Sequence, residues 1–160
     1  LNSRVEELEQ YQRTNNIEIK GVPSEGDPTD VVKRICSLID VPANDSDIDV
    51  CHRVPTFRQD TKNIIVRFVH RTKRNKVLEK AKKHKLTTAS LDYGGAASPI
   101  YVNEHLTSLN KKLPGAAIAQ KRRVGWRFVW SAGGKIFARK NDTAEAVRIM
   151  CLDDVAKIAN

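Results

Sequence analysis

Residues 16–23 read NIEIKGVP, in which isoleucine alternates with polar residues and glycine and proline close the run. A period of two is typical of a β-strand with one face in the core, and glycine and proline mark the turn that follows. Residues 63–69 read NIIVRFV and alternate in the same way. We therefore expect two strands of one sheet, whose inward side chains are Ile17, Ile19, Ile64, Val66 and Phe68.

The segments around these strands complete the order β-α-β-β-α-β, the ferredoxin-like split pattern. The expected elements are a helix at 28–40, strands at 48–54 and 63–69, a helix at about 72–84, a turn or hairpin at 85–98 and a strand at 100–102. Thr29 or Asp30 is the expected N-cap of the first helix, because both residue types accept hydrogen bonds from backbone N–H groups there.

Residues 104–160 predict a second, smaller unit of order α-β-β-β-α. The expected elements are a helix that opens at Leu106-Thr107, strands at 126–130, 135–139 and 146–150, and a closing helix at 152–158. Pro114-Gly115 predicts a kink or a break in the first of these helices, since proline lacks the N–H that a helix needs. The expected fold class is therefore α+β, with domains at 15–103 and 104–160.

The first residues carry a short heptad pattern. Leu1, Val5 and Leu8 are spaced by four and then three, with charged residues between them. We assign residues 1–14 to the end of a coiled coil that forms a homo-oligomer; the alternative is that they pack on the following domain. Because the chain opens inside this helix and without Met, we expect it to be a fragment.

The composition gives no sign of an enzyme, a metal site or a membrane protein. No run approaches the ~18 apolar residues of a membrane span. The three cysteines and four histidines lack metal-ligand spacing, and an odd number of scattered cysteines indicates a reducing compartment. Gly133-Gly134-Lys135 lacks the spacing of a phosphate-binding loop. We expect no catalytic residue, no metal and no cofactor.

The charge is strongly asymmetric along the chain. Residues 1–60 hold 7 Lys or Arg and 12 Asp or Glu, whereas residues 61–160 hold 21 and 7, a net +14. Such a field attracts polyanions, and it predicts nucleic acid lying along a shared cationic track. The densest source is the basic helix near 72–84, of which about half should contact phosphate. Candidate contacts are Arg53, Arg67, Lys73, Arg74, Lys82, Lys83, Arg122, Arg123 and Lys140.

The hairpin at 126–139 predicts a more specific binding surface than the charge pattern does. A three-residue loop, Ala132-Gly133-Gly134, would bury Trp126, Phe128, Trp130, Ile136 and Ala138. The opposite face would then carry one aromatic ring among basic residues, with phosphates on the charges and a base on Phe137; its members are Arg127, Val129, Lys135, Phe137 and Arg139. A two- or four-residue loop would shift the register and mix the faces. For any one of these rings, core packing is the more frequent role.

The first unit has the strand order of an RNA-recognition motif, with residues 17–22 at the first-strand signature and 63–68 at the third-strand place. That family presents aromatic rings on these strands, on which bases stack. The equivalent positions here are Glu18, Asn63 and Ile65. The aromatic platform is missing, so we expect a noncanonical RNA-recognition motif.

Longer motifs carry a more particular resemblance. In order, they are NNIEIKGVP (15–23), CHRVP (51–55), IIVRF (64–68), YVNEHLT (101–107), WRFVW (126–130) and GKIFARK (134–140). With the heptad stub, they resemble the first-open-reading-frame proteins of LINE-type retrotransposons, and equally the baculovirus few-polyhedra (FP) protein domain. The resemblance spans essentially the whole chain. It implies a coiled coil, trimeric in LINE-type proteins, and two domains that clamp single-stranded RNA. It also places Arg58, Lys62 and Lys112 where those proteins have RNA-contacting arginines.

We therefore expect a sequence-nonspecific single-stranded nucleic-acid-binding protein and chaperone. RNA is the expected partner and DNA the alternative, in an intracellular ribonucleoprotein of the cytoplasm or the nucleus. The competing hypothesis is a structural interaction protein of the FP type, whose basic surface meets a viral partner or a packaged genome. Salt-titrated binding to single-stranded RNA separates the two, because only the first requires a steep salt dependence.

Overall fold

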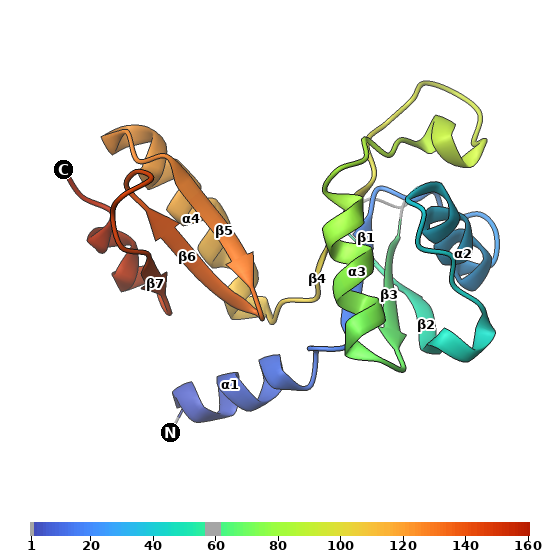
Figure 1. The fold of residues 1–160 in the computed structure, drawn as a ribbon, viewed down its shortest axis with the longest axis horizontal. Helices are drawn as coiled ribbons and strands as arrows, with labels where there is room; N and C mark the ends of the chain where they lie inside the picture. The colour runs from blue at the N-terminus through green and yellow to red at the C-terminus, as the bar shows by residue number, and fades with distance from the viewer. Residues whose placement is uncertain (1, 57–61) are drawn as a thin grey trace. The chain divides into compact units, whose positions relative to one another are not determined.

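The structure of the protein is a computed structural model that describes residues 2–56 and 62–160 (Figure 1). The chain divides into two units: Asn15–His105 forms one, and the residues up to Thr14 form the other together with Leu106–Asn160. Each unit contains one antiparallel sheet, with strand orders β2-β3-β1-β4 and β5-β6-β7. The predicted mixed α+β class is confirmed.

The first unit follows the expected order of elements, with short 3-10 helices (η) in two connections. Its elements are β1 (Asn16–Lys20), α2 (Pro28–Leu38), η1 (Asp45–Asp47), β2 (Ile48–Val54), β3 (Asn63–Phe68), α3 (Arg71–Ala81), η2 (Thr88–Leu91) and β4 (Tyr101–Glu104). The segment before β4 is tied back by a bridge between Thr87 and Pro99.

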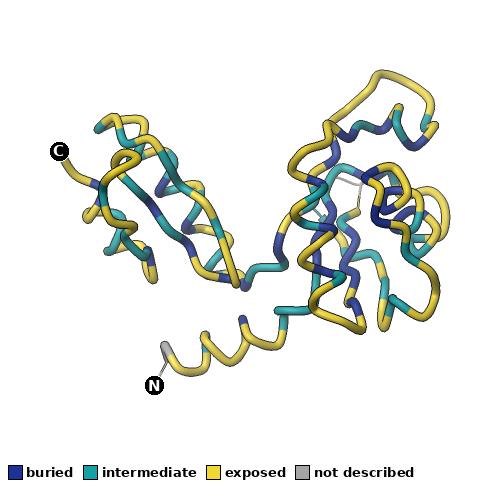
Figure 2. Tube along the Cα trace, viewed as in Figure 1, coloured by how far each residue is buried: buried dark blue, intermediate teal, exposed yellow. Residues whose placement is uncertain are grey.

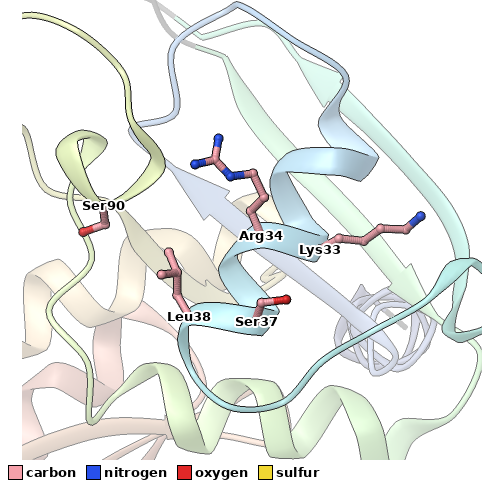
Figure 3. A pocket seen from close by; sticks show the side chains of 5 residues that line it. All are labelled: Lys33, Arg34, Ser37, Leu38 and Ser90. Atoms are coloured by element: carbon pink, nitrogen blue, oxygen red, sulfur yellow. The ribbon is translucent and has the colours of Figure 1, made fainter.

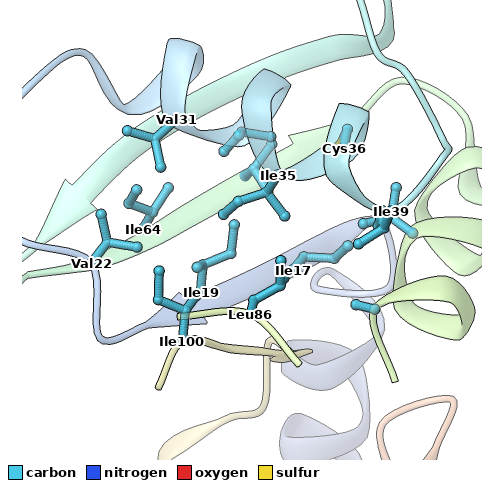
Figure 4. Packing of buried hydrophobic residues seen from close by; sticks show 14 of the residues in the cluster. Ile17, Ile19, Val22, Val31, Ile35, Cys36, Ile39, Ile64, Leu86 and Ile100 are labelled. Atoms are coloured by element: carbon cyan, nitrogen blue, oxygen red, sulfur yellow. The ribbon is translucent and has the colours of Figure 1, made fainter. Parts of the chain in front are cut away.

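Alternation along the central strands decides where the core of this unit lies. The five inward side chains predicted from β1 and β3 are all buried, in one cluster with Val32 and Ile35 of α2 and Val77 of α3. Figure 4 shows Ile17, Ile19 and Ile64 of these strands together with Ile35. Burial of that many branched side chains is the main stabilising term for a small domain, at about 25 cal/mol per Å² of apolar surface removed from water. The prediction of this core from period-two alternation is confirmed.

The start of α2 differs from the prediction. The N-cap is Asp27, whose side chain accepts a hydrogen bond from the backbone N–H of Thr29 at 2.8 Å. Pro28 is therefore the first helical residue, a position where the missing N–H costs nothing. The expected caps Thr29 and Asp30 lie inside the first turn, one and two residues after that proline.

The second unit is built from α1 (Asn2–Tyr11), α4 (Ser108–Val124), β5 (Phe128–Ala132), β6 (Lys135–Arg139), β7 (Val147–Ile149) and η3 (Leu152–Lys157). One face of its sheet is covered by α4 (Figure 1). The small core between them comprises Leu113, Ala117, Ile136, Ala138, Ile149 and Ile158. The predicted closing helix is thus a 3-10 helix, and the first strand begins two residues later than predicted.

Of the kink or break predicted at Pro114, the break is wrong, because α4 is one helix from Ser108 to Val124 with the proline inside it. One proline removes one backbone hydrogen bond of the helix. Leu113 and Ala117, on either side of it, are fully buried in the same core, so packing on the sheet holds both halves in a single helix. None of the described helices is both long enough and apolar enough to span a membrane.

Candidate nucleic-acid interface

A two-residue turn sets the register of the C-terminal hairpin. Gly133 and Gly134 have φ of +58° and +75°, and Ala132 pairs with Lys135 on the two strands that they join. Positive φ at both central residues is what a tight hairpin turn requires, and glycine adopts it without strain. The register that follows places Trp130 opposite Phe137, and Phe128 opposite Arg139.

This register corrects the predicted faces. A three-residue loop had placed Phe128 and Trp130 in the core and Val129 on the basic face, and both assignments are wrong. Val129 packs against the core instead, whereas Trp130 remains 36% exposed. Because side chains alternate with a period of two, a change of one residue in the loop moves the whole of β5 to the other face. Sequence reasoning therefore missed Phe128 and Trp130 as surface residues.

The face of the sheet that points away from α4 carries three aromatic rings and three cationic side chains. On β7, Arg148 pairs with Phe137 and so extends this surface to the third strand. We name it the aromatic–arginine face; its members are Phe128, Trp130, Lys135, Phe137, Arg139 and Arg148. It contains no carboxylate, so its positive charge is not neutralised within the surface itself.

The rings and guanidinium groups of this face are already stacked on one another. The ring centroids of Trp130 and Phe137 lie 5.6 Å apart, with 23° between their planes. The guanidinium carbon of Arg139 lies 5.2 Å from the centroid of Phe128 and 6.0 Å from that of Trp130. These are offset stacking and cation–π geometries, and they keep the two rings and the guanidinium group in contact with one another at the surface of the sheet.

Two arginines of the aromatic–arginine face form no ion pair within the described part of the chain. Among the residues that the structure describes, the Nε atoms of Arg139 and Arg148 have no hydrogen-bond partner, and neither side chain forms an ion pair. By contrast, Arg127, just before β5, is paired with Asp142 at 3.0 Å. A buried N–H without a partner is costly, but these two Nε atoms are shielded from solvent and are not exposed donors for a ligand.

Two basic residues predicted to bind nucleic acid are instead part of the first unit's framework. Arg53 donates to the backbone carbonyls of Pro23 and Glu25 at 2.7 Å each, and to that of Gly26 at 3.0 Å. Lys73 donates to the carbonyl of Pro42 at 2.7 Å. Both cations fix loops and are partly exposed, and their predicted contact with phosphate stays a prediction.

Arg74 is the clearest correction, because it is only 5% exposed. Its guanidinium donates to the carbonyl of Asn16 at 3.1 Å and pairs with Glu104 at 3.5 Å, so that α3 is joined to β1 and β4. Burial lowers the pKa of Arg74, and the neighbouring Glu104 acts in the opposite direction. An arginine sealed in this way cannot reach a phosphate in solution.

The remaining predicted cations that the structure describes are exposed. In the first unit they are Lys62, Arg67, Lys82 and Lys83, and in the second Lys112, Arg122, Arg123 and Lys140. Arg67 lies 3.6 Å from Asp49 and Lys83 4.0 Å from Glu79, which are weak surface pairs. Three of the second set are on α4, which covers the opposite side of the sheet from the aromatic–arginine face. Arg58 lies outside the described residues.

The outer face of the first sheet has a different chemistry. Glu18, in the middle of β1, is only 2% exposed, and it pairs across the sheet with Ile65 and Asn103. Its carboxylate accepts from Asn63 at 3.4 Å and lies 3.9 Å from the Nζ of Lys20. A carboxylate at the centre repels phosphate, and the positions that would need aromatic rings hold none, as predicted.

Two hollows lie on the first unit. One, of about 320 Å³, is lined by Lys33, Arg34, Ser37, Leu38 and Ser90 (Figure 3). Both of its cations already have carboxylate partners, Asp45 for Lys33 and Asp92 for Arg34, so it does not favour an anion. The other, of about 760 Å³, lies at the ends of β1 and β4 and is bordered by Thr56 and Asn63. Over the described part of the chain, no three His, Cys, Asp or Glu side chains converge as a metal site would require.

Comparison with known proteins identifies the segment that carries the aromatic–arginine face. Residues 107–159 match the family model of Baculovirus FP protein domain 2. This FP domain 2 segment runs from the N-cap of α4 through η3, and the match confirms the FP part of the predicted resemblance. The first unit lies outside the match, and no curated protein matches the chain.

Proposed function

We propose that this protein binds single-stranded nucleic acid without sequence preference and acts as a nucleic-acid chaperone. RNA is the proposed partner, and single-stranded DNA the alternative. The observation that carries the proposal is the aromatic–arginine face: three rings and three cations on one side of a sheet, with no carboxylate among them. Unpaired bases and a phosphate backbone need this combination of surfaces.

Binding would join two contributions. Bases that are free of a duplex would stack on Trp130 and Phe137, which is worth ~1–3 kcal/mol per base and does not depend on sequence. Phosphates would lie against Arg139, Arg148 and Lys135 and release counterions, which makes the affinity depend on salt. A duplex satisfies only the second contribution, because its bases are already stacked on one another.

The first unit would add a weaker, electrostatic contribution. Its element order and its β2-β3-β1-β4 sheet support our proposal that it is a variant of the RNA-recognition motif without aromatic stacking. The exposed cations Lys62, Arg67, Lys82 and Lys83 would then contact phosphate, as the resemblance to LINE-type first-open-reading-frame proteins implies for Lys62. We further propose assembly in an intracellular ribonucleoprotein, in the cytoplasm or the nucleus.

Assembly through the N-terminal helix belongs to the same proposal. Val5 and Leu8 of α1 are 51% and 58% exposed and retain the heptad spacing; Leu1 lies outside the described residues. Exposed apolar residues at these positions fit the end of a coiled coil. We propose a homo-oligomer, a trimer by the LINE-type resemblance.

A second candidate is favoured by the FP domain 2 match: a structural protein that binds another protein through the same face. Tryptophan and arginine are the residues that most often dominate protein–protein binding energy. This candidate predicts a saturable protein interface with weak dependence on salt and on nucleic-acid strandedness.

Filter binding of the whole chain to single- and double-stranded RNA and DNA at two salt concentrations separates the candidates. We expect micromolar or tighter binding to poly(U), falling steeply with salt and weaker for duplexes of equal length. Equal affinity for single and double strands would contradict base stacking. Failure to bind any nucleic acid would reject the proposal in favour of the protein interface. Chaperone activity is then tested by the rate at which the protein anneals complementary strands.

A further inference from the structure

Gln10 is buried, although most of α1 is exposed (Figure 2). Its Oε1 accepts hydrogen bonds from the backbone N–H of Thr107 and from the Nδ2 of Asn110, both at 3.0 Å. Asn110 also donates to the carbonyl of Gly134 at 3.3 Å. Gln10 therefore connects three segments that are far apart in the sequence: α1, the start of α4 and the turn between β5 and β6.

The side chain of Gln10 also fills the space beside that turn. A Cβ atom added at Gly134 would lie 2.5 Å from the Cγ of Gln10 and 2.8 Å from its Cδ. Gly134 has a φ of +75°, so the backbone conformation and the packing both require glycine at this position. The close fit holds Gly134 as the second residue of the turn.

The position of Gly134 in the turn decides which side chains form the outer face. With a two-residue turn, Trp130 lies opposite Phe137, whereas a three-residue loop would place Trp130 opposite Ile136. That one-residue change would turn Phe128 and Trp130 toward the core and break up the aromatic–arginine face. A contact that fixes the turn thus acts on the face without touching a ligand.

We propose that Gln10 is a positioning residue that couples α1 to nucleic-acid binding. Docked through Gln10, α1 stabilises the two-residue turn and so the arrangement of Trp130 and Phe137. By linkage, nucleic acid bound at the face stabilises the docked helix to the same extent. Val5 and Leu8 stay exposed in the docked helix, so an oligomer formed through them would be coupled to the same face. The coupling of α1 to nucleic-acid binding rests on the proposed function, whereas the positioning of the turn by Gln10 does not.

The test compares Gln10→Ala with Gln12→Ala in the full chain. Gln12 is a matched control, since it is exposed in the turn directly after α1 and its side chain has no hydrogen bond among the described residues. We expect Q10A to lower the affinity for poly(U) on the order of 3- to 10-fold, the usual effect of removing a hydrogen-bonding partner. Q12A should leave it unchanged, and Gln10→Glu, which keeps an oxygen acceptor of the same reach, should retain most of it.

Hydrogen exchange supplies a readout that does not depend on nucleic acid. In Q10A without ligand, amides of residues 131–136 should exchange faster than in wild type; in wild type, poly(U) should slow exchange in α1. Unchanged affinity together with unchanged exchange at 131–136 in Q10A would overturn the inference. If wild type fails to bind poly(U), the proposed function falls, while the exchange of the ligand-free variant still decides whether Gln10 positions the turn.

A double-mutant cycle tests the packing itself. Gly134→Ala should destabilise wild type more than it destabilises Q10A, because alanine at position 10 removes the Cγ against which the new Cβ would lie. Equal destabilisation in both backgrounds would mean that the strain belongs to the turn alone and would contradict the contact.

Discussion

The two sheets of this protein share an architecture and differ in chemistry. Both are antiparallel, and both are covered by helices on one face. The outer face of the first sheet has the buried carboxylate of Glu18 at its centre. The outer face of the second has Trp130 and Phe137 stacked there, with Arg139 against Trp130. The difference indicates that the two outer faces would treat a nucleic acid differently: the first has a carboxylate at its centre, and the second has rings and cations.

The basic residues illustrate the point. Arg53, Lys73 and Arg74 of the first unit are held by backbone carbonyls or by a buried carboxylate, so they stabilise the fold. Arg139 and Arg148 of the second unit contact rings or remain without acceptors in the described structure. Net charge alone cannot separate cations that stabilise the fold from cations that would bind a ligand. Four mutational or chemical experiments can separate them.

The largest expected effect is on stability and concerns Arg74. Replacing Arg74 by Ala leaves Glu104 buried without its cation, and breaking a buried ion pair in this way costs ~3–5 kcal/mol. We expect the denaturation midpoint to fall sharply while the folded fraction binds poly(U) as before. Lys76→Ala, an exposed cation on the same helix, is the control and should change the midpoint little. Loss of affinity for poly(U) in folded R74A would mean that Arg74 contributes to binding and would contradict its purely structural role.

Removal of a stacked ring should have the next largest effect. Trp130→Ala or Phe137→Ala should weaken poly(U) binding by ~1–3 kcal/mol, or about 5- to 150-fold, because a base loses its stacking surface. Tyr101→Ala removes an exposed ring from the first sheet and should have a much smaller effect. If Y101A and W130A weaken binding equally, the proposed contrast between the two sheets is wrong.

Arg139→Lys should have a smaller effect, because it keeps the charge and loses the flat guanidinium. A cation–π contact at a partly exposed site is worth ~0.5–2 kcal/mol, so affinity should fall about 2- to 30-fold with an unchanged salt slope.

Arg148→Ala should instead lower the slope of log K against log salt by ~0.7, the value for one phosphate contact on a single strand. Isothermal titrations over a salt series distinguish the effect of R139K from that of R148A. An unchanged salt slope in R148A would show that Arg148 does not contact phosphate.

The smallest effect on binding is expected from the thiols, which report on each unit separately. Burial raises the pKa of the Cys36 thiol to about 11 and also raises that of Cys51, whereas Cys151 is exposed. Because the thiolate is the nucleophile, Cys151 should react with a maleimide at neutral pH and Cys36 only when the first unit opens. Mass spectrometry after brief labelling checks this, and R74A should increase labelling at Cys36. Rapid labelling of Cys36 in wild type would contradict the buried core.

Local patterns predicted the first unit well because its signals are short-range. The alternation of Ile17, Ile19, Ile64 and Val66 fixes both the strand type and the buried face. The cap of α2 was misplaced, by choosing Thr29 or Asp30 over Asp27, and the Pro28 that follows Asp27 was the signal that favoured it. The segment predicted as a turn or hairpin at 85–98 contains the 3-10 helix η2, and α2 and α3 end two to three residues earlier than predicted.

The second unit was predicted less well because its register depends on contacts distant in sequence. Two loop lengths around Gly133-Gly134 are compatible with the local sequence, and the choice between them is supported by Gln10, more than a hundred residues earlier. Burial of Arg74 is equally invisible in a charge pattern, since it depends on Glu104 lying across the sheet. The paired glycines alone, which favour a two-residue turn, could have pointed to the correct face.

The central claim is that Trp130 lies on the surface that receives bases, and the protein's two tryptophans allow a direct test. Trp126 packs against the core and donates its Nε1–H to the carbonyl of Ala159 at 2.7 Å. Titration with poly(U) should therefore quench the tryptophan fluorescence of Trp126→Phe, in which Trp130 remains. The fluorescence of Trp130→Phe, in which only Trp126 remains, should be almost unchanged. Quenching that is confined to Trp126, or absent from both variants while poly(U) binds, would contradict the account.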